Sequence, residues 1–70
     1  MTPGIYEHYK KKLYRVYFIA EDAETEEKMV VYSPMDNPEQ YYVRKLDHFL
    51  QNVQVEEEEI PRFKFVSKEH

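Results

Sequence analysis

The sequence has no cysteine, no tryptophan and a single glycine, Gly4, among its 70 residues. Without cysteine the chain has no disulfide, no thiol nucleophile and no thiolate ligand for zinc. A single glycine excludes the glycine-rich loops that cradle phosphate groups. No apolar run approaches the roughly 18 residues of a membrane-spanning helix, and residues 1–4 lack the basic and apolar regions of a signal peptide. The expected location is therefore the cytoplasm.

A chain of this length predicts one small domain, covering residues 1–70. The hydrophobic fraction of 41% and the aromatic fraction of 16% favour a folded chain over a disordered one. A core of this size supplies only about 3–5 kcal/mol of net stability, and there is no disulfide to add to it. Association of two copies would bury more surface, so the expected state is a monomer or a weak homodimer.

Acidic residues outnumber basic residues by 14 to 10, and the net charge is −4. Because an acidic molecule repels a phosphate backbone, nucleic acid is not the favoured partner. The charges are segregated, however: basic residues gather at 10–12 and 62–68, and acidic residues at 21–27 and 56–59. A local basic face therefore stays open as an alternative.

Residues 13–20 form the longest run of β-branched and aromatic side chains, and they predict the central strand of the fold. With a period of two, one side of this run is wholly apolar or aromatic. That side consists of Tyr14, Val16, Phe18 and Ala20. Because successive side chains of a strand point to opposite faces, we expect this side to face the core.

Shorter alternating runs predict further strands. They lie at 4–9, 28–33, 41–44, 51–55 and 60–66. Polar segments at 10–12 and 21–27 predict hairpin loops, and apolar residues at helical spacing predict one helical or 3-10 turn near 46–50. So short a chain cannot form a two-sheet sandwich of normal size. We therefore expect a mainly β fold, a small SH3-like barrel of five to six antiparallel strands, in which a bent sheet hides its own edges.

Four blocks of the sequence resemble the bacterial family of small uncharacterised domains called DUF1653. They are Tyr6-Glu7-His8-Tyr9-Lys10, Leu13-Tyr14-Arg15-Val16, Val30-Val31-Tyr32 and Pro61-Arg62-Phe63. Arg44, Leu46 and Phe49 also stand where the family has such residues, and the resemblance runs from Gly4 to Val66. The resemblance implies a single compact SH3-like β domain, and it implies no function.

The chain departs from the family's pattern in four places. Lys11 stands where the family usually has glycine, and Glu56 and Glu57 stand where it usually has an Asp-Gly turn. Because glycine serves turns that need a positive φ, we expect other turn types at these two hairpins. The loop at 21–24 lacks the family's basic and hydroxyl side chains, and Tyr42 replaces a usual tryptophan.

No metal ligand, cofactor site or catalytic residue is predicted from the remaining polar side chains. The three histidines, His8, His48 and His70, have no partner at the spacing typical of zinc ligands. Hydroxyl groups other than those of tyrosine are few, and none lies in a nucleophile motif. An enzymatic alternative rests on His8 as a general base near Glu24 or Arg44. The simpler interpretation is that His8 is a hydrogen-bonded strand residue.

Tyrosine is the one residue type in clear excess, with seven among the 70 residues. Tyrosine is favoured at binding surfaces because it offers large, stiff, amphipathic area, although the same rings can simply fill a small core. We expect a non-catalytic module that binds a protein or peptide, either on exposed tyrosines or along a sheet edge. The residues expected to contact this partner are Tyr6, His8, Tyr9, Tyr32, Tyr42, Arg44 and Arg62.

The alternative partner is nucleic acid, bound by stacked tyrosines beside basic side chains. This alternative requires the basic residues to share one face of the molecule. They are residues 10–12, Arg15, Arg44, Arg62 and Lys64.

Overall fold

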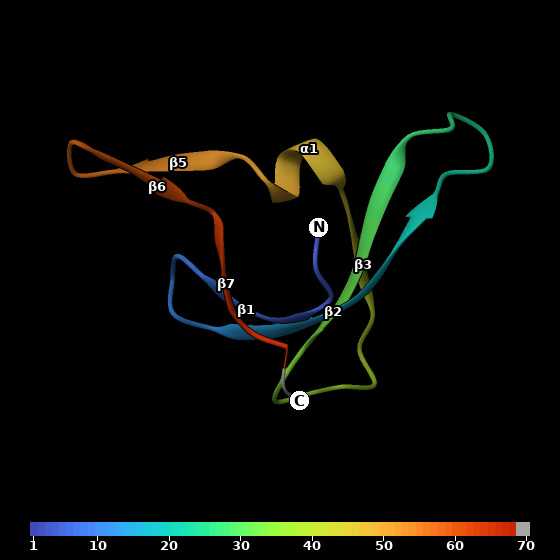
Figure 1. Cartoon of the computed structure of the whole chain (residues 1–70), viewed down its shortest axis with the longest axis horizontal. Coiled ribbons are helices and arrows are strands. Elements are labelled where there is room, and N and C mark those ends of the chain that lie inside the picture. Colours follow the sequence, from blue (N-terminus) through green and yellow to red (C-terminus); the bar gives the residue numbers. More distant parts are fainter. Residues whose placement is uncertain (69–70) are drawn as a thin grey trace.

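The computed structural model describes residues 1–68. Seven strands form two antiparallel sheets, and there is one short helix (Figure 1). The elements in chain order are β1 (Gly4–His8), β2 (Leu13–Glu21), β3 (Lys28–Pro34), β4 (Tyr42–Lys45), α1 (Leu46–Phe49), β5 (Asn52–Val55), β6 (Glu58–Pro61) and β7 (Phe63–Ser67). Five strands pair in the order β4-β3-β2-β1-β7, and β5 pairs with β6 as a separate hairpin. The prediction of a mainly β fold with a helical turn near 46–50 is confirmed.

The strand pairing leaves β4 and β7 as the two edges of the five-stranded sheet within the described residues. The strands therefore form a bent sheet and a hairpin, with the short helix between them along the chain (Figure 1). No helix in the described part of the chain is long and apolar enough to cross a membrane.

β2 is the middle strand of the five-stranded sheet, as the alternation of residues 13–20 predicts. Val16 is only 2% exposed, but Phe18 is 57% exposed, so the expectation that Phe18 faces the core is wrong. A β-bulge is the reason, because Tyr17 of β2 has no counterpart in β3. The extra residue shifts the two-residue period by one, so that Phe18 points away from the core and Ile19 packs against it.

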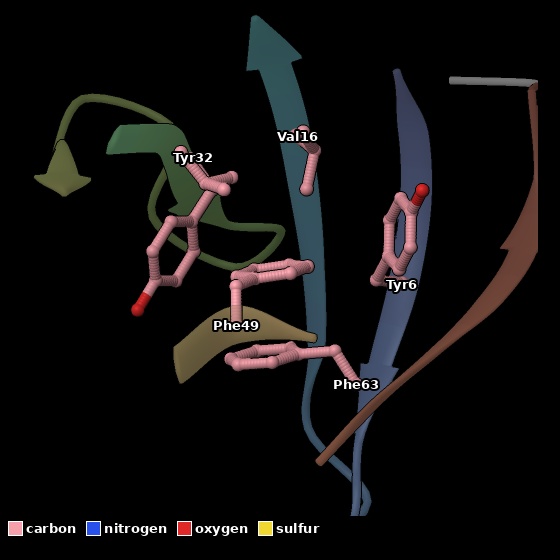
Figure 2. Close-up of a cluster of buried hydrophobic side chains, with 6 residues drawn as sticks. Tyr6, Val16, Tyr32, Phe49 and Phe63 are labelled. Atoms are coloured by element: carbon pink, nitrogen blue, oxygen red, sulfur yellow. The ribbon is translucent and has the colours of Figure 1, made fainter. Parts of the chain in front are cut away.

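The core lies on the face of the sheet that α1 covers (Figure 2). Phe49 of α1 stacks on Phe63 of β7, with ring centroids 4.0 Å apart and ring planes 3° from parallel. Tyr6 and Tyr32 pack edge-on against Phe49 from β1 and β3. We call this side of the sheet the inner face and the opposite side the outer face. The buried apolar and aromatic residues are Tyr6, Val16, Val30, Tyr32, Phe49 and Phe63.

The predicted strand at 60–66 is divided into β6 and β7, which gives seven strands instead of five to six. The division falls at Arg62, whose N–H donates to the carbonyl of Gln51 at 3.1 Å. The carbonyl of Arg62 accepts a hydrogen bond from the N–H of Tyr9 at 2.9 Å. Arg62 thus connects the β5–β6 hairpin to the end of β1, and the following residue, Phe63, enters the core.

The two hairpins in which the resemblance predicts other turn types keep the positive φ angles that glycine favours. Lys11, between β1 and β2, has a φ of 80°, and Glu56 and Glu57, between β5 and β6, have φ angles of 55° and 125°. Glu56 and Glu57 form a two-residue loop. Positive φ angles at both positions of such a loop are typical of the type I′ turn, whose twist matches that of the strands. The strand pairing therefore imposes positive φ angles on residues that have a Cβ, and each such residue destabilises the fold by about 1–2 kcal/mol.

We expect Glu57→Gly to stabilise the protein, because glycine relieves the strain of a φ of 125°. The expected gain is about 1–2 kcal/mol, which for a domain of this size raises Tm by roughly 5–10 °C. Thermal unfolding followed by circular dichroism measures it. Glu57→Gln is the matched control, because it removes the same charge from the run at 56–59 and keeps the Cβ. An equal rise in Tm for Glu57→Gln would assign the effect to charge repulsion instead.

Candidate functional site

Strand pairing brings most of the residues predicted to contact a partner onto the inner face of the sheet. Tyr32 of β3 lies opposite Val16 of β2 and Tyr42 of β4, and His8 of β1 lies opposite Phe63 of β7. Directly paired residues on neighbouring strands point to the same side. Since Val16 is in the core, these side chains all project toward the side that α1 covers.

A continuous series of rings crosses this inner face, and we call it the aromatic track. His8 lies 4.5 Å from Tyr9 and 5.0 Å from Phe63, measured between ring centroids. Phe63 lies 5.6 Å from Tyr32, which lies 5.8 Å from Tyr42. The middle of the track is buried, whereas Tyr42 is 42% exposed and Tyr9 is half-buried. Solvent therefore reaches the track at both ends.

Tyr6, one of the predicted contact residues, belongs to the core and not to the surface. Its side chain is only 6% exposed, and its ring packs edge-on against Phe49 and Phe65. The Tyr6 hydroxyl donates to the carbonyl of Thr2 at 2.6 Å. Burial raises the pKa of Tyr6, and the hydrogen bond to Thr2 opposes that rise. Tyr6 therefore belongs to the core beside Phe49 and offers a partner almost no area.

The remaining tyrosines divide between the track and a separate pair. Tyr14, expected in the core, is half-buried beneath the track, with its ring 5.4 Å from that of Tyr32. Tyr17, at the bulge of β2, lies 5.7 Å from the exposed Tyr41. This second pair contacts no ring of the track among the described residues, so Tyr41 provides a comparison for Tyr42.

Two arginines lie close enough to His8 to act on its charge, and we call His8, Arg44 and Arg62 the Arg/His cluster. The Nε of Arg44 donates to the hydroxyl of Tyr32 at 3.2 Å, and its Cζ lies 5.7 Å from the centroid of Phe63. Arg62 directly precedes Phe63 in the chain. The Nε of Arg62 is buried and has no hydrogen-bond partner in the described structure.

The surroundings of His8 favour the neutral imidazole. Burial lowers the pKa of His8, and the positive charges of Arg44, Arg62 and Lys10 lower it further. The Nδ1 of His8 accepts a hydrogen bond from the backbone N–H of Lys10 at 3.1 Å. Because Nδ1 is the acceptor, the neutral ring has its proton on Nε2. His8 can therefore donate one further hydrogen bond.

No carboxylate balances the charge of the Arg/His cluster within residues 1–68. The ion pairs of the described structure are Lys12–Asp36, Lys28–Glu21 and Lys45–Glu27. Each of these ion pairs is formed by a lysine whose side chain is exposed, and none includes Arg44, Arg62 or His8. The cluster is thus a local excess of positive charge in a protein whose net charge is −4.

A hollow of about 330 Å³ opens beside His8, between the end of β1 and the β6–β7 junction. It is lined by Glu7, His8, Tyr9, Lys11, Ile60, Pro61 and Lys64. A larger hollow, of about 500 Å³, lies elsewhere, against Arg15 and Tyr17. The Nε of Arg15 is also buried without a partner, but neither His8 nor another arginine lines that hollow.

The arrangement bears unequally on the two alternatives considered from the sequence. Glu24 lies beyond the far end of β2 from His8, a separation of about 30 Å for an extended strand of this length, whereas Arg44 lies close enough to His8 to lower its pKa. Arg15 and Lys64 are paired with Ile5 and Glu7, which places them on the outer face, away from Arg44. The basic residues are therefore not gathered on one face. No group of three potential metal ligands occurs in the described residues, and His70 lies outside them.

Comparison with known proteins agrees with the resemblance seen in the sequence. A crystal structure of a protein belonging to DUF1653 from Bordetella bronchiseptica superposes with a TM-score of 0.84 and 31% sequence identity. The match covers 94% of this chain and 87% of that one. No functionally curated protein matches the chain. Residues 4–65 match the family described as "Protein of unknown function (DUF1653)", and the chain belongs to that family.

Proposed function

We propose that this domain is a non-catalytic binding module that docks a protein or peptide on its aromatic track. The observation that carries the proposal is the unbroken series of rings from Tyr42 to Tyr9, which reaches solvent at both ends. Tyrosine and histidine rings give a partner large contact area at small entropic cost. The buried middle of the track holds the exposed ends in place, so little ordering is needed on binding.

The position of Tyr42 adds a second argument. Tyr42 belongs to β4, which is an edge of the five-stranded sheet in the described structure. An edge strand has unpaired backbone groups, and an extended peptide can pair with them while its side chains contact neighbouring rings. A peptide lying along β4 thus meets Tyr42 directly.

A protein partner is favoured over nucleic acid for two reasons. The net charge of −4 opposes a polyanion at long range. The basic residues are also divided between the two faces of the sheet, with Arg44 on the inner face and Arg15 and Lys64 on the outer one. The proposal places the module in the cytoplasm.

The test is capture of a partner by the immobilised domain from nuclease-treated extract of the source cells, quantified by mass spectrometry. We expect Tyr42→Ala to reduce capture of the specific partner by about tenfold or more, as removal of an exposed aromatic anchor does at other interfaces. Tyr9→Ala should act in the same direction at the other end of the track.

Tyr41→Ala is the matched control, because Tyr41 is 63% exposed, immediately precedes Tyr42 and packs on Tyr17 instead of the track. The Tyr41→Ala domain should capture as much of the specific partner as the unaltered domain does. Equal losses in Tyr41→Ala and Tyr42→Ala, or loss of capture on nuclease treatment alone, would overturn the proposal.

A further inference from the structure

The Arg/His cluster is short of negative charge although the chain has acidic residues in excess. Fourteen aspartates and glutamates are present, yet none forms an ion pair with Arg44 or Arg62 in the described structure. Partial burial of a guanidinium without a counter-charge is unfavourable. An anion supplied from outside would offset this cost.

The hydrogen-bond donors of the cluster are also unused. Arg44 uses its Nε for the hydroxyl of Tyr32, and its two terminal amino groups donate to no acceptor in the described residues. The side chain of Arg62 makes no hydrogen bond there, and its Nε is shielded from solvent. His8, with Nδ1 already bonded to the backbone of Lys10, has its Nε2–H free. The planar guanidiniums of Arg44 and Arg62 and the imidazole donor of His8 are therefore available within one cluster.

We propose that the Arg/His cluster binds an oxyanion, a carboxylate or a phosphate, carried by the partner that docks on the aromatic track. The inference rests on the proposed function for the identity of the carrier, since His8 belongs to both the cluster and the track, and Arg44 bonds to Tyr32 of the track. Guanidinium groups bind carboxylate and phosphate oxygens through pairs of parallel hydrogen bonds. The lowered pKa of His8 fits this role, because an uncharged imidazole donates to the anion without adding to the repulsion between Arg44 and Arg62.

The site is suited to one anionic group and not to a polyanion. Among the described residues, the charges that act on His8 are those of Arg44, Arg62 and Lys10, and the acidic charge of the whole molecule opposes a long phosphate chain. A single carboxylate or phosphate held by the donors of the cluster would anchor the partner beside His8, within the track. The neighbouring rings would then fix the direction in which the partner chain leaves the site.

The test is an NMR titration of the intact domain with sodium acetate and, separately, with sodium phosphate, each at constant ionic strength maintained with sodium chloride. We expect saturable shifts of the His8 ring signals and of the Phe63 amide with at least one of the two anions. We also expect the bound anion to raise the pKa of His8, because it offsets the positive charges of Arg44 and Arg62. Acetate and phosphate as separate arms identify the group that the site prefers.

Arg62→Gln should weaken binding by about tenfold or more, as loss of charge-assisted hydrogen bonds does. Arg15→Gln is the matched control, because Arg15 likewise has a buried Nε without a partner but lies in the other hollow. The affinity of the Arg15→Gln domain for the anion should stay within about twofold of that of the unaltered domain. Arg44→Gln provides a second variant should Arg62→Gln unfold, and it also should weaken binding.

The inference fails if the shifts rise linearly without saturation, if sodium chloride alone reproduces them, or if Arg15→Gln weakens binding as much as Arg62→Gln. An adventitious surface contact would give the first of these results. The proposed function fails separately: oxyanion binding with no Tyr42-dependent capture refutes only the partner on the track. Tyr42-dependent capture that Arg44→Gln and Arg62→Gln leave unchanged refutes only the oxyanion.

Discussion

Alanine in place of Phe49 is expected to leave most of the protein unfolded at 25 °C. Phe49 is 1% exposed, stacks on Phe63 and packs edge-on against Tyr6 and Tyr32. Removing a buried phenylalanine ring costs about 3–5 kcal/mol. A core in a domain of this size supplies a net stability of about the same magnitude. Urea denaturation and the dispersion of the NMR spectrum measure the loss.

The same change at an exposed phenylalanine separates burial from residue type. Phe18 is 57% exposed on the outer face, so Phe18→Ala should alter the free energy of unfolding by less than about 1 kcal/mol. Phe49→Leu keeps most of the volume and should cost roughly 1.5 kcal/mol. If Phe49→Ala and Phe18→Ala unfold at the same urea concentration, the helix that bears Phe49 does not close the core as described.

The second large effect is expected at Gly4, where alanine should destabilise the protein by roughly 2–4 kcal/mol. Gly4 has a φ of 146°, a conformation that other residues adopt only with strain. A Cβ there would also collide with the carbonyl oxygen of Ser67 and lie 3.1 Å from the Cα of Lys68. Both of these are backbone atoms, which cannot move aside as a flexible side chain can. The approach of β1 to the end of β7 thus depends on the absence of a side chain.

Thermal and urea unfolding of Gly4→Ala check this expectation. Thr2→Ala is the control, because Thr2 is exposed and its hydrogen bond to Tyr6 uses the backbone carbonyl, which the change leaves in place. It should change stability by no more than about 0.5 kcal/mol. A stability of Gly4→Ala close to that of Thr2→Ala would mean that the chain ends separate at little cost.

The fold could be predicted from the sequence where the signal is local. The alternation at 13–20 gives a strand because the period of two is a property of the strand itself, and the change of period near Phe49 gives the helical turn. The bulge at Tyr17 could not be predicted, because it depends on how β3 aligns with β2 and not on β2 alone. The exposure of Phe18 follows from that alignment.

In the candidate site, too, the residue types could be predicted from the local sequence, whereas their arrangement depends on strand pairing. His8, Arg44 and Arg62 are distinctive residue types, and the sequence singles them out as contact residues. Phe63, whose ring lies beside His8 and Arg44, is not among the predicted contacts, since its role arises from the pairing of β7 with β1 and from the stacking of α1. Tyr6 was expected at the surface and is buried, because a short sequence does not tell which alternate ring faces the covered side of the sheet.

The turns show a further limit of local inference. The resemblance identifies Lys11 and the pair Glu56-Glu57 as replacements for glycine-containing turns, which suggests a different backbone path. The structure keeps the positive φ angles instead. The conformation of a hairpin turn is set by the twist of the two strands that it joins. The paired residues of these strands therefore impose that conformation on whatever residue occupies the loop.

The pairing of β1 with β7 also governs how the domain can be joined to other chains. Ile5 lies opposite Ser67, so the first strand of the fold begins beside the point where the last strand ends. A host protein could therefore accommodate the fold within one of its surface loops, because the gap between Ile5 and Ser67 is only about the distance between adjacent strands, roughly 5 Å. By the same geometry, a short linker could close the backbone into a ring, with new ends opened at an exposed hairpin.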